Sequence, residues 1–290
     1  MQHPKTPMKV NRRRFMEAGV LGSAALALAG LRQSVDAAVT KPALPPYRGL
    51  KLGVASYTFR KFTLEQAIAM TKQAGAGYIS LKDFHLPYKS TAAERQEARK
   101  KIEGAGLVLI SGGVIYTKND EPEVRSFFQY AKDAGMPTIV CSPDIDALDL
   151  VEKMAKEYQI RIAIHNHGPG DKKYPSPLDV LRLVKDRDQL IGICIDVGHT
   201  VRLGEDPLEV IRQCAARLYD FHIKDVTEPA QKGKPTEVGL GVIDIVGVLK
   251  TLVQIQYPYH VGLEYEAKEN DPMSGVIESF GYMRGVLAAI

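Results

Sequence analysis

Short apolar runs alternate with amphipathic segments from about residue 50 to the end of the chain. Eight runs have the length and the Val, Ile and Leu content of buried strands. The predicted strands span residues 52–57, 78–81, 107–111, 138–141, 162–165, 191–196, 218–223 and 260–263. Predicted helices lie between and after them, at residues 63–74, 92–104, 122–134, 145–158, 177–187, 207–216, 243–254 and 274–288. Thr63 and Gln66 have capping-box spacing, and Gly75, Gly104 and Gly135 are placed as C-terminal caps.

Strands that are apolar throughout and alternate with helices are typical of a parallel sheet covered by helices. Eight such units favour closure into a barrel over an open sheet. An open dinucleotide-binding sheet would also need a Gly-rich loop after its first strand, and Ala55-Ser56-Tyr57-Thr58-Phe59 stands there instead. The sequence therefore predicts an α/β protein with a single (β/α)8 TIM barrel over residues 41–290.

Residues 1–40 are predicted to be a twin-arginine signal peptide and linker. Asn11-Arg12-Arg13-Arg14-Phe15-Met16 resembles the export motif, and an Ala- and Gly-rich apolar stretch follows over residues 20–31. That stretch is short for a bilayer span, and Ala37 and Ala38 offer a cleavage point. A membrane anchor and a chance basic patch are the alternatives. We expect a periplasmic or secreted mature protein with no membrane segment.

Removing this segment changes the charge of the chain. The whole chain has 38 basic and 34 acidic side chains, and residues 1–40 contain six of the basic and two of the acidic ones, so 32 of each remain. A protein that binds nucleic acid through phosphate contacts should keep a basic excess. We therefore expect no nucleic-acid partner. The three cysteines are widely spaced in apolar segments and predict buried thiols.

The last four predicted strands each end within one residue of a side chain that can bind a metal. These residues are His165, Asp196, His222 and Glu264. The carboxyl ends of barrel strands meet on one face, so the four side chains should converge there. Two imidazoles and two carboxylates suit one divalent Mn, Zn, Co or Fe ion better than Ca. A single histidine at a strand end is usually structural, but four of the six histidines after residue 40 cluster here, which favours a metal site.

Several motifs together resemble the xylose isomerase-like TIM-barrel superfamily, which includes sugar phosphate isomerases and epimerases. They are Asp-x-x-His at residues 196–199, His-x-Lys-Asp at 222–225, the strand-terminal Glu264, and Gly-Leu-Gly at 239–241 with Asp244. The resemblance covers nearly the whole chain after residue 40. It implies a carbohydrate enzyme with metal ligands at positions 165, 196, 222 and 264. It also implies that His199 contacts the substrate.

The chain departs from the family pattern at position 165, where the sugar epimerases have Glu and this chain has His. Those epimerases are thought to use two glutamates on opposite faces of the substrate, so Glu264 lacks its opposite partner. A His in this position resembles exported sugar-processing members suggested to act as lyases or hydratases on 3-keto-glycosides. Residues 164–168 and 81–87 are similar to theirs.

These reactions share a first step, in which a base removes the proton beside a carbonyl. Reprotonation then gives an isomer or epimer, whereas expulsion of a neighbouring group gives elimination. The leading interpretation is a metal-dependent sugar isomerase or epimerase that enolises a keto-sugar. The alternatives are a lyase or hydratase with the same site and a non-catalytic sugar-binding barrel. A DNA-repair endonuclease of the same superfamily is disfavoured by the charge.

The candidate catalytic bases and substrate contacts follow from the same strand ends. Glu264 ranks first as the base, ahead of Lys82, whose pKa would have to be lowered, and His167, which could also hold the metal or orient a ligand. The candidate substrate contacts are His199, Lys224 and His85, and Lys224 should point the same way as His222. Tyr57 and Phe59 are a candidate apolar wall. We expect a small, unphosphorylated carbohydrate substrate, and the sequence leaves the oligomeric state open.

Overall fold

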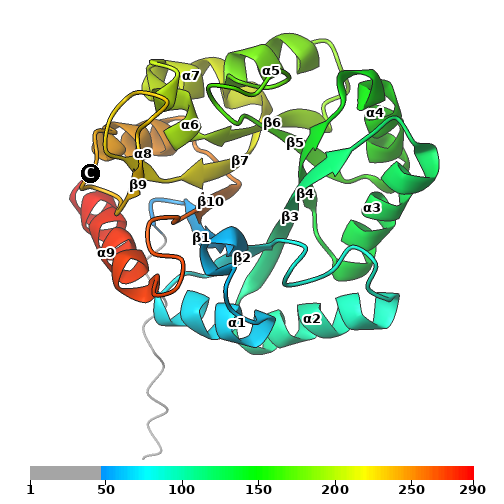
Figure 1. Ribbon diagram of the computed structural model, residues 1–290, viewed down its shortest axis with the longest axis horizontal. Helices are drawn as coiled ribbons and strands as arrows, with labels where there is room; N and C mark the ends of the chain where they lie inside the picture. The colour runs from blue at the N-terminus through cyan, green and yellow to red at the C-terminus, as the bar shows by residue number, and fades with distance from the viewer. Residues whose placement is uncertain (1–46) are drawn as a thin grey trace, which may run out of the picture. The chain divides into compact units, whose positions relative to one another are not determined.

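Eight parallel strands close into a barrel surrounded by helices in the computed structural model, which describes residues 47–290 (Figure 1). The strands are β1 (Lys51–Ala55), β2 (Tyr78–Leu81), β3 (Val108–Thr117), β4 (Thr138–Pro143), β5 (Arg161–His165), β6 (Ile191–Asp196), β7 (Leu218–Ile223) and β10 (His260–Leu263). Their order around the barrel is β1-β10-β7-β6-β5-β4-β3-β2. The predicted TIM barrel is confirmed. The predicted signal peptide, residues 1–40, lies outside the described residues.

The predicted helices form the outer ring. They are α1 (Leu64–Gln73), α2 (Ala92–Gly104), α3 (Glu121–Ala134), α4 (Leu148–Tyr158), α5 (Pro177–Val184), α7 (Pro207–Cys214), α8 (Ile245–Gln254) and α9 (Met273–Ala289). Within residues 47–290, none of the helices is both long enough and apolar enough to cross a bilayer. The capping box at Thr63 and Gln66 is formed. Gly75 and Gly135 have the left-handed φ expected after a helix, whereas after α2 it is Gly106 and not Gly104 that adopts it.

The boundaries differ from prediction where tertiary hydrogen bonds intervene. Strand β1 ends at Ala55, and residues predicted to continue it form a 3-10 helix, η2 (Ser56–Phe59). Thr58 explains the change, because its hydroxyl donates to the Leu263 carbonyl (3.0 Å) and accepts from the Tyr265 N–H (2.9 Å). Strand β3 runs six residues beyond its predicted end at Ser111. Residues 145–158 divide into η3 (Ile145–Ala147) and α4.

Two elements were not predicted. Helix α6 (Val197–Arg202) follows β6 directly, and a short antiparallel ribbon joins β8 (Asp225–Val226) to β9 (Pro235–Thr236). Asp196 caps α6, since its Oδ1 accepts from the His199 N–H at 3.0 Å. A third 3-10 turn, η4 (Ala215–Arg217), precedes β7.

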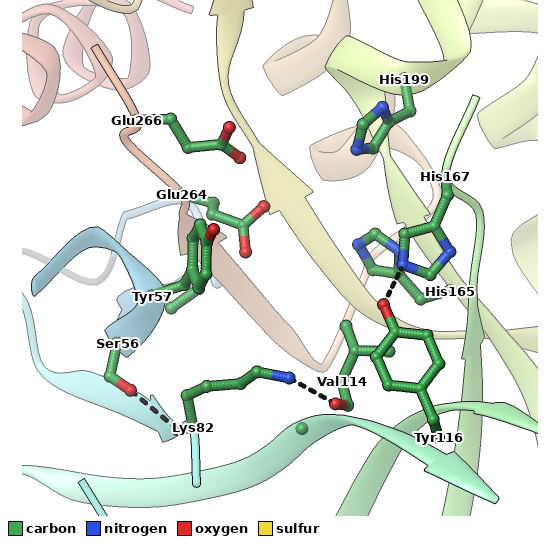
Figure 2. Close-up of a pocket in the computed structure, with 12 residues that line it drawn as sticks. Ser56, Tyr57, Lys82, Val114, Tyr116, His165, His167, His199, Glu264 and Glu266 are labelled. Carbon is green, nitrogen blue, oxygen red and sulfur yellow. Dashed lines mark hydrogen bonds between the residues drawn. The ribbon is translucent and has the colours of Figure 1, made fainter. Parts of the chain in front are cut away.

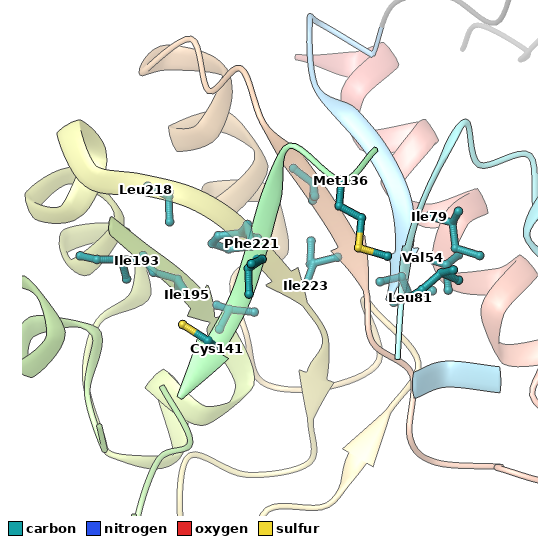
Figure 3. Packing of buried hydrophobic residues seen from close by; sticks show 14 of the residues in the cluster. Val54, Ile79, Leu81, Met136, Cys141, Ile193, Ile195, Leu218, Phe221 and Ile223 are labelled. Carbon is teal, nitrogen blue, oxygen red and sulfur yellow. The ribbon is translucent and has the colours of Figure 1, made fainter. Parts of the chain in front are cut away.

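The apolar core lies mostly between the strands and the helices. Figure 3 shows this packing around Phe221 and Ile223 of β7, with Val54, Ile79 and Leu81 from β1 and β2. A smaller apolar cluster contains Val140, Ala163 and Cys194 from β4, β5 and β6. All three cysteines are buried and free, which confirms the prediction of buried thiols.

A buried polar cluster crosses the barrel between β3, β7 and β10. The Ser111 hydroxyl donates to Asp220 Oδ2 at 2.6 Å, and His260 Nδ1 lies 3.1 Å from Asp220 Oδ1. The backbone N–H of Phe221 adds a third contact, at 2.8 Å. Asp220 is fully buried, and two residues later on the same strand comes His222. This cluster therefore lies next to the strand ends and holds three strands together through one carboxylate.

Candidate metal centre and substrate cavity

The four predicted metal ligands come together at the ends of four neighbouring strands. His165 ends β5, Asp196 ends β6, His222 lies near the end of β7 and Glu264 follows β10. One nitrogen or oxygen atom from each lies within 4.8 Å of the other three. The register of the four strands aligns these positions, as His165 pairs with Cys194, Asp196 with His222, and His222 with Gly262. The parallel register of the barrel therefore brings together residues separated by about a hundred positions.

The geometry of this cluster fits a divalent cation. His165 Nε2 lies 3.1 Å from His222 Nδ1 and 3.7 Å from Asp196 Oδ2, and His222 Nδ1 lies 3.6 Å from Glu264 Oε2. Two nitrogen and two carboxylate oxygen donors facing one point are a set typical of Mn, Fe, Co or Zn sites. Burial lowers the pKa of His165 to about 3, so its ring stays neutral and can bind a metal.

Cys194 lies near the same two histidines and is a second candidate ligand. Burial raises the pKa of its thiol to about 12. A thiol binds metals as the thiolate, so a protonated Cys194 is a poor ligand at neutral pH. The group with Asp196 and Glu264 is therefore the better metal site.

Lys224 lies among the carboxylates and is 2% exposed. Its ammonium contacts Asp196 Oδ2 at 2.9 Å, Glu264 Oε2 at 2.7 Å and Glu266 Oε1 at 2.7 Å. Burial alone would raise the pKa values of Asp196 and Glu264, but the Lys224 charge outweighs it and holds both well below their usual range. Lys224 points toward the cluster, as predicted. It does not reach the cavity surface, so its predicted contact with substrate is not supported by its position.

A cavity of about 250 Å³ opens beside the cluster. Figure 2 shows Glu264, Glu266 and Tyr57 on one wall and three histidines on the facing wall, with Lys82 and Tyr116 below. The facing histidines are His165, His167 and His199. The volume is below the range for drug-sized ligands, and it suits one small polar molecule.

Lys82 lines this cavity, as its predicted role requires. Its ammonium donates to the Val114 carbonyl at 2.6 Å, and its backbone N–H donates to the Ser56 hydroxyl at 2.8 Å (Figure 2). Burial lowers the Lys82 pKa, although the carboxylates of Asp83 and Glu264 oppose the shift. A lysine with a lowered pKa can exchange a proton closer to neutral pH than an exposed one.

His167 lies on the facing wall, and both of its ring nitrogens have protein neighbours. Its Nε2 lies 3.1 Å from the Tyr116 hydroxyl, and its Nδ1 lies 3.1 Å from Asp171 Oδ2. His167 is outside both groups of converging ligand atoms found in the described residues, so its position suits the predicted orienting or acid-base role better than ligation. The Tyr116 ring stacks on His167 at 5.8 Å between centroids.

His199 lines the cavity, with Nε2 at 4.0 Å from Asp196 Oδ2. His85, the third predicted substrate contact, lies elsewhere. Its Nε2 contacts the Phe62 carbonyl at 3.0 Å, and it lines a separate cavity near α1 and α2. The turn after β2 directs the ring away from the strand ends. Of the two residues predicted to form an apolar wall, Tyr57 lines the cavity, whereas Phe59 is fully buried in the apolar core.

Sequence reasoning missed Ser56, Tyr116 and Glu266 as cavity residues. Glu266 had a usable signal, because it follows Glu264 by two residues in an extended segment and so faces the same way. Tyr116 had none, since it belongs to the part of β3 beyond the predicted end.

Two aspartates of the motifs that resemble the family, Asp225 and Asp244, hold backbone segments through hydrogen bonds. Asp244 caps α8 through the Gly247 N–H (2.8 Å). Asp225 accepts from the backbone N–H groups of Gly239 (2.9 Å), Gly241 (3.0 Å) and Ile243 (3.1 Å). Asp225 is fully buried, so one carboxylate fixes the loop that follows β9.

Asp225→Ala is expected to destabilise the protein, since it leaves the three loop N–H groups without their acceptor. We expect a loss of about 3 kcal/mol in the free energy of unfolding, given that hydrogen bonds to charged groups are worth 1.5–3 kcal/mol each but the loop can rearrange. Urea unfolding followed by circular dichroism measures it. Asp186→Ala is the control, because that side chain is exposed. Equal stability of the two variants would contradict the structural role of Asp225.

Comparisons with known proteins agree with the barrel. A family model described as "Xylose isomerase-like TIM barrel" matches residues 68–286. Inosose dehydratase of Clostridium beijerinckii is 23% identical over 257 residues, which cover 82% of this chain and 84% of that protein. A solved structure of an uncharacterised protein from Parabacteroides distasonis is 26% identical with a TM-score of 0.64, covering 81% and 98%. The structure of 3-keto-D-glucoside 4-epimerase from E. coli, 15% identical, covers 81% and 99% with a TM-score of 0.67, a likeness of fold alone.

Proposed function

Because the chain belongs to the xylose isomerase-like TIM barrel family, we propose that it is a metal-dependent carbohydrate enzyme that removes a proton beside the carbonyl of a keto-sugar. We further propose that it then expels an oxygen group from the adjacent carbon, as a carbon-oxygen lyase. The observation that supports elimination most is which side chains form the cavity wall opposite Glu264. A histidine stands at position 165, and Tyr116 with His167 supplies a proton donor there in place of a second carboxylate.

The proposed roles follow from what each side chain can donate or accept. A bound divalent ion, held by His165, Asp196, His222 and Glu264, would polarise the carbonyl and acidify the neighbouring C–H. Glu264 lines the cavity beside the cluster and its carboxylate can accept a proton, so it is the proposed base. It takes the proton in the first step, which leaves an enolate, and the electron pair of the enolate then forms a C=C bond as the C–O bond on the next carbon breaks.

The leaving oxygen needs a proton as it departs. The Tyr116 hydroxyl faces the cavity and contacts His167, behind which Asp171 lies at 3.1 Å. His167 can return a proton to Tyr116 when its ring is protonated, and the Asp171 carboxylate favours that protonated form against burial, which lowers the His167 pKa. His199 is the proposed substrate contact on the same wall. The relative named inosose dehydratase supports this reading, because a dehydratase is a carbon-oxygen lyase.

Isomerisation or epimerisation, the leading interpretation from the sequence, is the second candidate. It is favoured by Lys82, whose pKa is lowered by burial and which lines the same cavity as Glu264. A proton returned to carbon by Lys82 would give an isomer or epimer with no loss of a group. A non-catalytic sugar-binding barrel is the remaining alternative.

Incubation with a 3-keto-glycoside in D₂O, followed by NMR, separates these candidates. We expect release of the aglycone together with an unsaturated keto-sugar or its hydrate. Deuterium in a recovered isomer would favour isomerisation instead. Tight binding without any turnover in the metal-loaded protein would contradict both enzymatic proposals.

Metal content tests the centre independently of the substrate. We expect about one divalent ion per chain in protein purified without chelator, and a large loss of it in His165→Ala, which removes one of four ligands. Inductively coupled plasma mass spectrometry measures the ion. His85→Ala is the matched control, because His85 lies outside the cluster. Unchanged metal content in His165→Ala would remove the four-ligand assignment.

The cavity volume of about 250 Å³ supports a single small sugar ring inside the site, with any leaving group near its mouth. An unphosphorylated carbohydrate is proposed as the substrate. A periplasmic or secreted location by twin-arginine export is also part of this proposal and rests on residues 1–40 of the sequence alone.

A further inference from the structure

The most unusual group beside the metal cluster is the buried ammonium of Lys224. It lies 2.7–2.9 Å from three different carboxylates, those of Asp196, Glu264 and Glu266. Its aliphatic chain passes over Gly198, where an added Cβ would lie 2.5 Å from Lys224 Cγ. Gly198 has no positive φ, so glycine is needed at this position for space and not for backbone conformation. The absence of a side chain at Gly198 therefore leaves the space that the Lys224 side chain occupies.

Lys224 contacts the same oxygen atoms that face the histidine ligands. Asp196 Oδ2 lies 3.7 Å from His165 Nε2 and 2.9 Å from the ammonium. Glu264 Oε2 lies 3.6 Å from His222 Nδ1 and 2.7 Å from the ammonium. An oxygen shared with an ammonium is a weaker donor to a metal ion. A divalent cation and Lys224 therefore compete for two of the four ligands.

Glu266 is the third partner of Lys224, and it is outside the group of converging ligands. It lines the cavity from a position two residues after Glu264. Three carboxylates and one ammonium leave two negative charges, which a divalent cation neutralises. Neutrality matters here because Asp196 and Lys224 are almost completely buried and charge is poorly screened inside a protein.

We propose that Lys224 is an internal counter-cation, which holds the metal-binding carboxylates together in the metal-free protein, and which gives up its contacts with Asp196 and Glu264 but keeps the one with Glu266 when a divalent ion binds. Lys224 and Glu266 are thus positioning residues that set the metal affinity, with opposite effects. Lys224 lowers the affinity by occupying the ligand oxygens, and Glu266 raises it by offering the ammonium another partner. This inference rests on the metal centre of the proposed function.

Metal affinity measured with Lys224→Met and Glu266→Gln tests the inference. We expect Lys224→Met to bind Mn²⁺ or Zn²⁺ about tenfold more tightly than wild type, and Glu266→Gln to bind the same ion about tenfold more weakly. A tenfold change in affinity is small compared with the full interaction energy of two charges in contact. Competition against a chelating indicator gives the dissociation constants. The matched controls are Lys268→Met and Glu269→Gln, two more exposed side chains of the same segment after β10.

Thermal unfolding gives a second readout that needs no substrate. Metal-free Lys224→Met should unfold at a lower temperature than wild type because its carboxylates repel one another, and saturating metal should raise its midpoint by more than it raises that of wild type. If Lys224 were purely structural, Lys224→Met would lower the unfolding midpoints with and without metal equally and would bind metal no more tightly than wild type, which would overturn the proposal.

If Lys224→Met does not fold with or without metal, an unchanged metal affinity in Glu266→Gln would overturn the proposal. Absence of metal binding in wild type would instead refute the metal centre.

Discussion

Glu264→Gln is expected to lower kcat/KM on a 3-keto-glycoside by about 10³-fold or more, which corresponds to about 4 kcal/mol of transition-state stabilisation. The amide keeps the size of the side chain and one oxygen that can face the metal. It cannot accept the proton from carbon. Because Glu264 also contacts Lys224 and lies 3.6 Å from His222, the change should weaken metal binding as well.

The two effects of this substitution can be separated by measuring exchange of the substrate C–H in D₂O at saturating metal. A lost base abolishes exchange even when the metal is restored, whereas a lost ligand is rescued by higher metal concentration. Glu269→Gln is the control, since that carboxylate pairs with Arg60 and Lys61 outside the cavity. Exchange within tenfold of wild type at saturating metal would assign the base to Lys82 or His167 instead.

The barrel and the four convergent side chains could be predicted because both depend on local pattern. Each strand is a short apolar run bounded by a helix. A side chain at the end of a parallel strand has a direction fixed by the pleat and by its neighbours in the barrel. His165, Asp196, His222 and Glu264 all obey this rule, and the structure places their donor atoms within 4.8 Å of one another.

The residues that prediction misplaced, His85 and Phe59, lie in the turns that follow β2 and β1, where the direction of a side chain depends on contacts with distant parts of the chain. His85 lies in a turn after β2, and its hydrogen bond to the Phe62 carbonyl directs it outward. Thr58 bends the chain into η2 through contacts with β10, more than two hundred residues away. Such contacts have no local signature in the sequence.

The charges around Lys224 were missed for a different reason. Alternation with His222 predicts the direction of the Lys224 side chain correctly. It does not reveal which side chains of other strands surround the Lys224 ammonium. Asp196 comes from β6 and Glu264 from the end of β10, so the environment of the ammonium depends on three strands at once. The structure therefore places Lys224 against the carboxylates of Asp196 and Glu264, an environment that the sequence around Lys224 does not reveal.

Asp220→Ala is expected to cause a large loss of stability, about 3–5 kcal/mol, which is the usual cost of removing one partner from a buried ion pair or hydrogen-bonded charge. Asp220 is fully buried and contacts Ser111, His260 and the Phe221 N–H. Burial alone would raise its pKa, but His260, His222 and Ser111 together outweigh burial and hold the pKa below its usual value, which favours the ionised carboxylate. Its removal leaves a histidine and a hydroxyl inside the barrel with no acceptor.

Urea unfolding of the metal-free protein measures this loss without a contribution from metal binding. Ser111→Ala is the matched comparison, because it removes one hydrogen bond at 2.6 Å and leaves the Asp220 contact with His260 intact, so about 1 kcal/mol is expected. A smaller loss in Asp220→Ala than in Ser111→Ala would contradict the role assigned to the carboxylate. Asp220 is not one of the four converging ligands, so the folded fraction of Asp220→Ala should still bind a divalent ion. The stability of the barrel interior is therefore expected to depend on Asp220, whereas the proposed metal binding at the strand ends depends on other carboxylates, those of Asp196 and Glu264.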